Sequence, residues 1–114
     1  MGIPNNTHQT ASNAIAGIGA YISLHTGAGG GTSGTNEASG GGYARVLTTW
    51  TAGTTGTNTG SAVNISCAAG TYTEGGIWSA LNGGTFVGSA PFAGGNVIVS
   101  GSGAAITVTP SNSA

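Results

Sequence analysis

Few side chains in this sequence can carry acid–base or charge chemistry. Formal charge is confined to Glu37, Arg45 and Glu74, and the chain has no aspartate and no lysine. Nucleophilic catalysis needs a nucleophile, a base and a group that orients the base. No serine lies in a Gly-x-Ser-x-Gly elbow, and the two glutamates are far apart in the chain. The sequence therefore predicts no catalytic residue and no enzymatic activity.

Glu37 and Arg45 are the natural partners of one another. They stand eight positions apart, on either side of the entry from a glycine-rich loop into an expected strand. We expect a structural ion pair that pins the loop at 27–42 to the sheet, with the modest contribution of about 0–1 kcal/mol that is typical of a surface pair. One alternative is that Arg45 binds an anionic partner. Another is a paired-carboxylate site made by Glu37 and Glu74, as glycoside hydrolysis needs.

Residue types that bind metals or phosphates are also sparse. The candidate metal ligands are His8, His25, Cys67 and a glutamate, and their spacing matches no zinc pattern. The glycine runs at 29–31 and 40–42 lack the lysine and Ser/Thr of a phosphate-binding loop. We therefore expect no metal and no cofactor. Cys67 is expected to pack as a small apolar residue.

Composition excludes several classes of partner. The chain has 114 residues, 24 glycines, one cysteine and a formal net charge of −1. A single arginine neutralises neither the phosphates of a nucleic acid nor an anionic membrane surface, so neither is an expected partner. Residues 1–20 show no signal peptide and no spanning helix, which favours assembly in a host cytoplasm. Because free proteins usually keep their net charge away from zero, a chain this neutral favours a fixed place in an assembly.

Hydrophobic periodicity predicts the elements that position these residues. Residues 8–18 have apolar side chains at helical spacing. Alternating patterns between turn signals predict seven short strands, at 20–25, 43–50, 61–69, 71–81, 85–90, 96–100 and 104–109. The last two are expected to pair across 101–103, and Asn82-Gly83-Gly84 is expected to form a hairpin turn. Gly75-Gly76 is expected to mark a bulge or bend.

Such spacing is typical of an all-β fold: a small antiparallel β-sandwich or barrel of about seven strands, with a short N-terminal helix. The chain divides into an N-terminal arm and short helix at 1–19, a β-sandwich domain at 20–110, and a polar tail at 111–114.

Three segments of the chain resemble a family of small virion proteins of tailed phages. They are residues 21–27 (YISLHTG), residues 36–46 (NEASGGGYARV), and residues 75–85 (GGIWSALNGGT) with the closing 104–109 (AAITVT). Their order and distances match over about residues 15–110. The chain departs from the family pattern in having Gly27-Ala28-Gly29 for an Asp-Pro-Gly, and Ser79 for an acidic residue.

The resemblance implies a structural protein of the virion with no catalytic residue. Members are described as tail-fibre-like, minor tail or capsid decoration domains. Glu37, Tyr43 and Arg45 are implied to determine the fold, and His25 belongs to the same motif set.

From the resemblance we expect a capsid decoration protein that sits on the capsid surface as a homotrimer. It would bind the major capsid protein and reinforce the assembled head. The alternative is a tail-fibre or minor tail module with receptor or glycan contact. A third reading, a carbohydrate or ice binder, requires Trp50 and Trp78 to be exposed or a flat threonine face.

Overall fold

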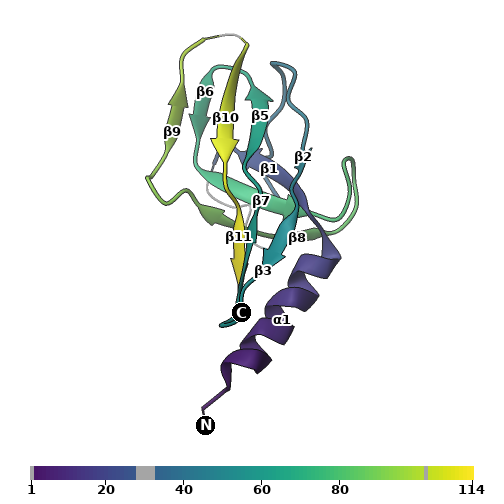
Figure 1. The fold of residues 1–114 in the computed structure, drawn as a ribbon. Helices are drawn as coiled ribbons and strands as arrows, with labels where there is room; N and C mark the ends of the chain where they lie inside the picture. The colour runs from purple at the N-terminus through teal and green to yellow at the C-terminus, as the bar shows by residue number, and fades with distance from the viewer. Residues whose placement is uncertain (1, 28–32, 102) are drawn as a thin grey trace.

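The computed structural model describes residues 2–27, 33–101 and 103–114 (Figure 1). Within these ranges one helix, α1 (Asn5–Ile18), precedes eleven short strands. The strands are β1 (Tyr21–His25), β2 (Val46–Leu47), β3 (Trp50–Ala52), β4 (Thr57–Gly60), β5 (Val63–Cys67), β6 (Gly70–Tyr72), β7 (Glu74–Trp78), β8 (Phe86–Pro91), β9 (Val97–Val99), β10 (Ala104–Val108) and β11 (Ser111–Ser113).

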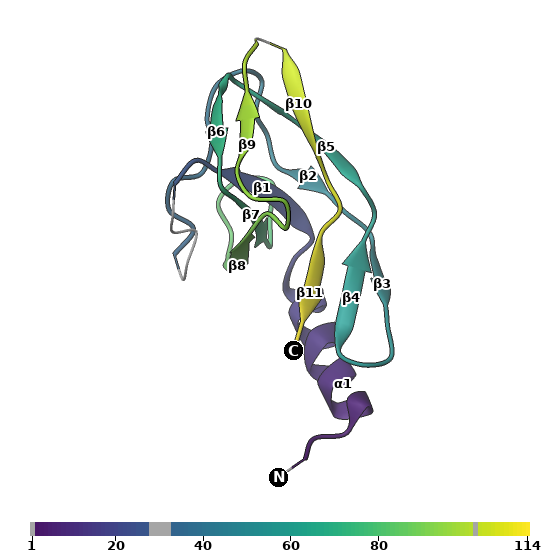
Figure 2. The same cartoon turned by 90° about the vertical axis from the view of Figure 1, so that its left-hand side faces the viewer.

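The strands pair antiparallel in four small sheets. The largest has the order β2-β1-β7-β8, a second has the order β11-β4-β3, and β10-β5 and β6-β9 are two-stranded. Figure 2 shows β11, β4 and β3 continuing downward beside α1, so that the molecule is elongated, with extents of 48 × 26 × 24 Å. The predicted class, antiparallel all-β with a short N-terminal helix, is confirmed. The number of strands exceeds the expected seven because two expected strands are each divided in two, and because β4 and β11 lie where no strand was expected.

The apolar core lies between β1 and the β5–β10 pair. Along β5 every second residue is buried, and the register of β5 on β10 places Ile65 opposite Ile106. Strict alternation of this kind buries one face of a strand and leaves the other polar. The buried apolar residues are Ile22, Leu24, Ala38, Val63, Ile65, Cys67, Tyr72 and Ile106.

The helix docks on the sheet through polar side chains. Its buried residues are Gln9 and Ser12. Gln9 Oε1 accepts from the backbone N–H of Gly56 at 2.9 Å, and Ser12 Oγ donates to Asn112 Oδ1 at 2.6 Å. Asn58 Nδ2 donates to Ser12 Oγ at 2.8 Å. No helix in the described part of the chain is long and apolar enough to cross a membrane.

This polar interface explains two differences from the expected elements. The segment at 51–60, where no strand was expected, contains most of β3 and all of β4, and the polar tail expected at 111–114 contains β11, which pairs with β4. The inward-facing residues of β4 and β11 include Asn58 and Asn112, so an apolar alternation was absent there. Hydrogen bonds to α1 take the place of apolar contacts.

The strand expected at 43–50 is also interrupted. Thr48 turns inward, is buried, and donates from Oγ1 to the carbonyl oxygen of Ser61 at 2.7 Å. The backbone N–H of Thr48 donates to the carbonyl oxygen of Ala20 at 2.8 Å, in the register of β2 on β1, whereas the carbonyl oxygen of Thr49 accepts from the N–H of Ser61 at 2.9 Å, in the register of β3 on β4. The chain therefore bends between β2 and β3.

Two turn predictions were wrong and one is confirmed. β9 and β10 do not pair across 101–103; β9 pairs with β6 and β10 with β5, because β5 offers β10 an apolar face of equal length. The register of β7 on β8 shifts between Ile77 and Trp78, where β8 has Val87 as an extra residue, and not at Gly75-Gly76, which pair regularly. The hairpin at 82–84 does join β7 to β8.

Candidate functional site

The motif residues converge on one polar cluster beside β1. Arg45 Nε and Nη2 donate to Glu37 Oε2 and Oε1, each at 2.8 Å, in a bidentate pair. Arg45 Nη1 also donates to the carbonyl oxygens of Ala80 at 2.9 Å and Gly83 at 2.8 Å. The guanidinium carbon lies 3.8 Å from the centre of the Trp78 ring. Arg45 therefore ties the segment before β2 to the β7–β8 hairpin.

The ion pair is more buried than a surface pair. The side chains of Arg45 and Glu37 are 8% and 22% exposed. Desolvation makes removal of one partner costly, because the other charge is left without compensation. The pair is therefore a stronger structural element than the surface pair expected from the sequence.

The protonation states of the cluster are set by its hydrogen bonds. Burial on its own would raise the pKa of Glu37, but the hydrogen bonds from Arg45 and Tyr43 outweigh it and hold that pKa below its usual value. The hydrogen bond to Glu37 raises the pKa of Arg45. Burial, and then the hydrogen bond to Glu37, raise the pKa of Tyr43. Tyr43 thus stays protonated and donates to Glu37 Oε2 at 2.7 Å.

His25 lies in a second hydrogen-bonded chain, whose central residues Ser23 and His25 are fully buried. Trp78 Nε1 donates to Ser23 Oγ at 3.1 Å, and Ser23 Oγ lies 2.8 Å from His25 Nε2. His25 Nδ1 lies 2.8 Å from the carbonyl oxygen of Thr35. Since a carbonyl oxygen only accepts, Nδ1 carries the proton and Nε2 accepts from Ser23. Ser23 and His25 are both 0% exposed, so this serine offers no surface to a substrate.

Gly76 leaves the space that the hydrogen-bonded side chains of Ser23 and His25 occupy. A Cβ at Gly76 would lie 2.5 Å from Ser23 Oγ and 2.6 Å from His25 Nε2. At the neighbouring Gly75 a Cβ would meet nothing closer than 3.4 Å, at Phe92. Gly76, and not Gly75, therefore serves the close packing of β1 on β7, which is a known role of glycine inside strands.

We expect the ion pair to make the stability of the protein depend on pH in the acid range. The pKa of Glu37 is held below its ordinary value of 4.5 in the folded state, so the unfolded chain binds more protons between the two values. The stabilising contribution is complete above the unfolded pKa and is lost as the pH falls through the folded pKa. Urea unfolding over a series of acid pH values measures this loss.

Glu37→Gln should be less stable than the wild type at neutral pH and should show a flatter acid dependence. Glu74→Gln is the matched control, because it removes the same charge and leaves Glu37 and Arg45 together. An acid dependence in Glu37→Gln as steep as that of the wild type would exclude Glu37 as its source.

The remaining candidate residues do not gather into a site. Glu37 and Glu74 lie in register on opposite sides of His25, and Glu74 Oε1 accepts from Ser89 Oγ at 2.9 Å, so each carboxylate is hydrogen-bonded within the fold. Cys67 lies in the apolar core. Among the described residues no group of three or more His, Cys, Asp or Glu side chains is placed to hold a metal ion. The glycine run at 29–31 lies outside the described residues.

The two tryptophans are half-buried and bonded inside the fold. Trp50 Nε1 donates to the carbonyl oxygen of Gly19 at 3.0 Å. Trp78 is covered by Arg45 and packs edge-to-face on Phe86, with 5.0 Å between ring centres. This arrangement does not support the carbohydrate platform that exposed tryptophans would have provided.

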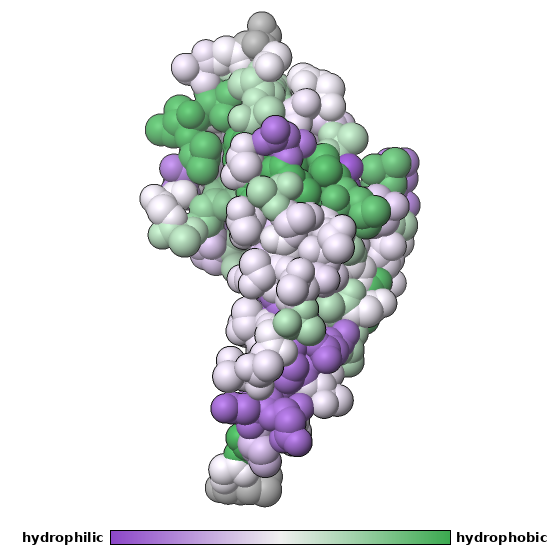
Figure 3. Space-filling view, viewed as in Figure 1, coloured by the Kyte–Doolittle hydropathy of each residue, from purple (hydrophilic) through white to green (hydrophobic). Residues whose placement is uncertain are grey.

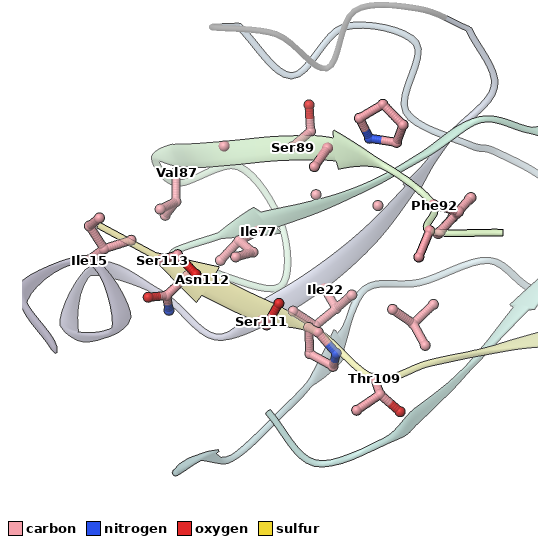
Figure 4. Close-up of a pocket in the computed structure, with 18 residues that line it drawn as sticks. Ile15, Ile22, Ile77, Val87, Ser89, Phe92, Thr109, Ser111, Asn112 and Ser113 are labelled. Carbon is pink, nitrogen blue, oxygen red and sulfur yellow. The ribbon is translucent and has the colours of Figure 1, made fainter. Parts of the chain in front are cut away.

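A groove of about 500 Å³ opens on the face of β7 that carries Ile77 (Figure 4). β8 forms one wall, and β11 with the second half of α1 forms the other. Ile77, Val87 and Phe92 contribute apolar side chains, and no charged residue lines the groove. Sequence reasoning missed it because its walls come from segments far apart in the chain, which only the sheet topology brings together.

A family model described as podophage GP4 fiber I protein gp80 matches residues 6–111. The match extends from α1 to the start of β11 and so covers nearly the whole fold. No curated protein and no solved structure matches the chain. The match names a fibre protein, and it therefore supports the tail-fibre alternative better than the capsid decoration protein expected from the sequence.

Proposed function

Since the chain belongs to the podophage GP4 fiber I protein gp80 family, we propose that it is a structural subunit of a phage tail fibre. The observation that carries this proposal is the family match over residues 6–111. The chain is thus a virion structural protein, as the sequence predicts, and its proposed place moves from the capsid surface to the tail.

The use of the ionisable groups supports a passive role. Glu37 and Arg45 are bonded to one another, and His25 is buried in a hydrogen-bonded chain. Ionisable side chains that are hydrogen-bonded to other groups of the fold in this way stabilise it, and they are not free to transfer protons to a substrate. The protein would work through its shape and through contacts made by uncharged surfaces.

Quantitative mass spectrometry of purified virions tests the proposal. A tail-fibre subunit should be present in a small fraction of the copy number of the major capsid protein. A copy number comparable with that of the major capsid protein would instead support capsid decoration. Absence of the chain from purified particles would contradict both virion assignments.

A further inference from the structure

The turn between β7 and β8 carries an exposed asparagine that is followed by glycine. Asparagine is one of the chemically labile residues of proteins. Asn82 precedes Gly83, and no other asparagine of the sequence precedes a glycine. Both residues are exposed, as are their neighbours Leu81 and Gly84. Figure 1 shows this turn projecting at the right of the molecule, and in Figure 3 hydrophilic atoms lie there beside apolar ones. Water therefore reaches both the side chain and the backbone of Asn82.

The backbone nitrogen of Gly83 is free to react with the side chain before it. In the described part of the chain no group accepts a hydrogen bond from the N–H of Gly83, and none bonds the side-chain amide of Asn82. Because glycine has no Cβ, no side chain shields this nitrogen from the carbonyl carbon Cγ of Asn82. A Cβ placed at Gly83 would meet nothing within 4 Å, so no other part of the described fold covers it either.

The other asparagines do not combine exposure with a following glycine. Asn58 and Asn112 are buried, and both are hydrogen-bonded to Ser12. Asn64 and Asn96 are exposed, but isoleucine follows the first and valine the second. The branched side chains of these residues crowd the backbone nitrogen that would have to attack. The features that favour attack therefore coincide at Asn82.

We propose that Asn82 deamidates spontaneously through a cyclic imide that it forms with Gly83. The backbone nitrogen of Gly83 bonds to Cγ of Asn82, the bond between Cγ and the side-chain nitrogen breaks, and ammonia leaves with the proton of the attacking nitrogen. Water then opens the ring. Opening at Cγ gives aspartate, whereas opening at the main-chain carbonyl carbon gives isoaspartate, in which the main chain runs through Cβ and Cγ. Water is the one co-reactant that these steps need.

Both products place a new carboxylate beside the polar cluster, because Asn82 borders the same small hollow as Glu37, Tyr43 and Arg45. Isoaspartate also lengthens the main chain of the turn by one carbon atom. It thereby displaces the carbonyl oxygen of Gly83, which accepts from Arg45 Nη1 at 2.8 Å. Aspartate leaves the main chain unchanged, so the isoaspartyl form should be the less stable of the two. The inference goes beyond the proposed function and does not depend on it.

Incubation of the purified chain at mildly alkaline pH, followed by peptide mapping with mass spectrometry, measures the reaction. Asn82 should convert into a mixture of aspartate and isoaspartate while the other asparagines stay intact. The rate should rise with pH, because the attacking nitrogen must lose its proton. A parallel incubation in guanidinium chloride gives the rate for the unfolded chain, and the folded chain should react at a comparable rate. A folded chain in which Asn82 stays intact would overturn the proposal.

Two variants test the consequence for the fold. Asn82→Asp supplies the aspartyl product directly, and Asn82→Gln is the control, because its longer side chain would have to close a larger ring. The isoaspartyl protein, separated by ion exchange, should unfold at a lower urea concentration than Asn82→Asp. Asn82→Gln should match the fresh wild type and stay unmodified during incubation. Equal urea midpoints for the isoaspartyl protein and Asn82→Asp would overturn the inferred loss of the contact between Arg45 and Gly83.

Discussion

Replacing Arg45 with alanine is expected to lower the free energy of unfolding by about 2–4 kcal/mol, slightly less than the loss for a fully buried pair. The change removes both hydrogen bonds to Glu37 and both bonds to the carbonyl oxygens of Ala80 and Gly83. It also uncovers Trp78 and leaves the carboxylate of Glu37 partly buried without its cation. Urea unfolding at neutral pH measures the loss.

The same variant should loosen the segment that Arg45 holds. Amide hydrogen exchange in residues 35–45 is expected to become faster, while exchange in β5 changes only with global stability. Arg45→Lys is the matched control, because lysine keeps the charge but cannot form the planar bidentate pair. Its stability should lie between those of the wild type and Arg45→Ala. Unchanged exchange in residues 35–45 of Arg45→Ala would show that the ion pair does not hold this segment.

The second large effect is expected at Gly76. A methyl group there would collide with Ser23 Oγ and His25 Nε2, at 2.5 and 2.6 Å. Neither side chain has room to move, since both are 0% exposed and joined to Trp78 and Thr35 by hydrogen bonds. We expect Gly76→Ala to lower the free energy of unfolding by about 1–3 kcal/mol, the usual range for an overpacked core.

Gly75→Ala is the control for this prediction, because it adds the same methyl group one residue earlier. Its nearest contact would be an ordinary one of 3.4 Å, so its stability should stay close to that of the wild type. Tryptophan fluorescence gives a second measurement, since Trp78 donates to the displaced Ser23. Equal stabilities for the two variants would contradict the close packing inferred at Gly76.

Alternating apolar residues predicted the strands whose side chains form the apolar core. β1 and β5 were found at nearly their expected bounds, because Ile22, Leu24 and Ile65 repeat on one face of each strand. β4 and β11 were missed because their buried side chains are Asn58 and Asn112, which pack on α1 through hydrogen bonds. A periodicity of apolar residues carries no signal for a polar interface.

The residues of the polar cluster could be named from the sequence, but their contacts could not. Glu37 and Arg45 stood out as the near pair among very few charges. The position of Trp78 above Arg45 depends on the register of β7 on β1, which no local pattern specifies. The double glycine at 75–76 was expected to mark a bulge or bend, but glycine within a strand can also mark a close approach of another group. The structure shows a close approach, and it does so at Gly76 alone.

Cryo-electron microscopy of the virion, with an antibody fragment against this chain as a marker, tests the assignment of this chain to a tail fibre. We expect the marker to bind to fibres attached to the tail and to leave the capsid shell bare. A marker spread over the capsid lattice, or particles without any marker, would contradict the assignment of this chain to a tail fibre.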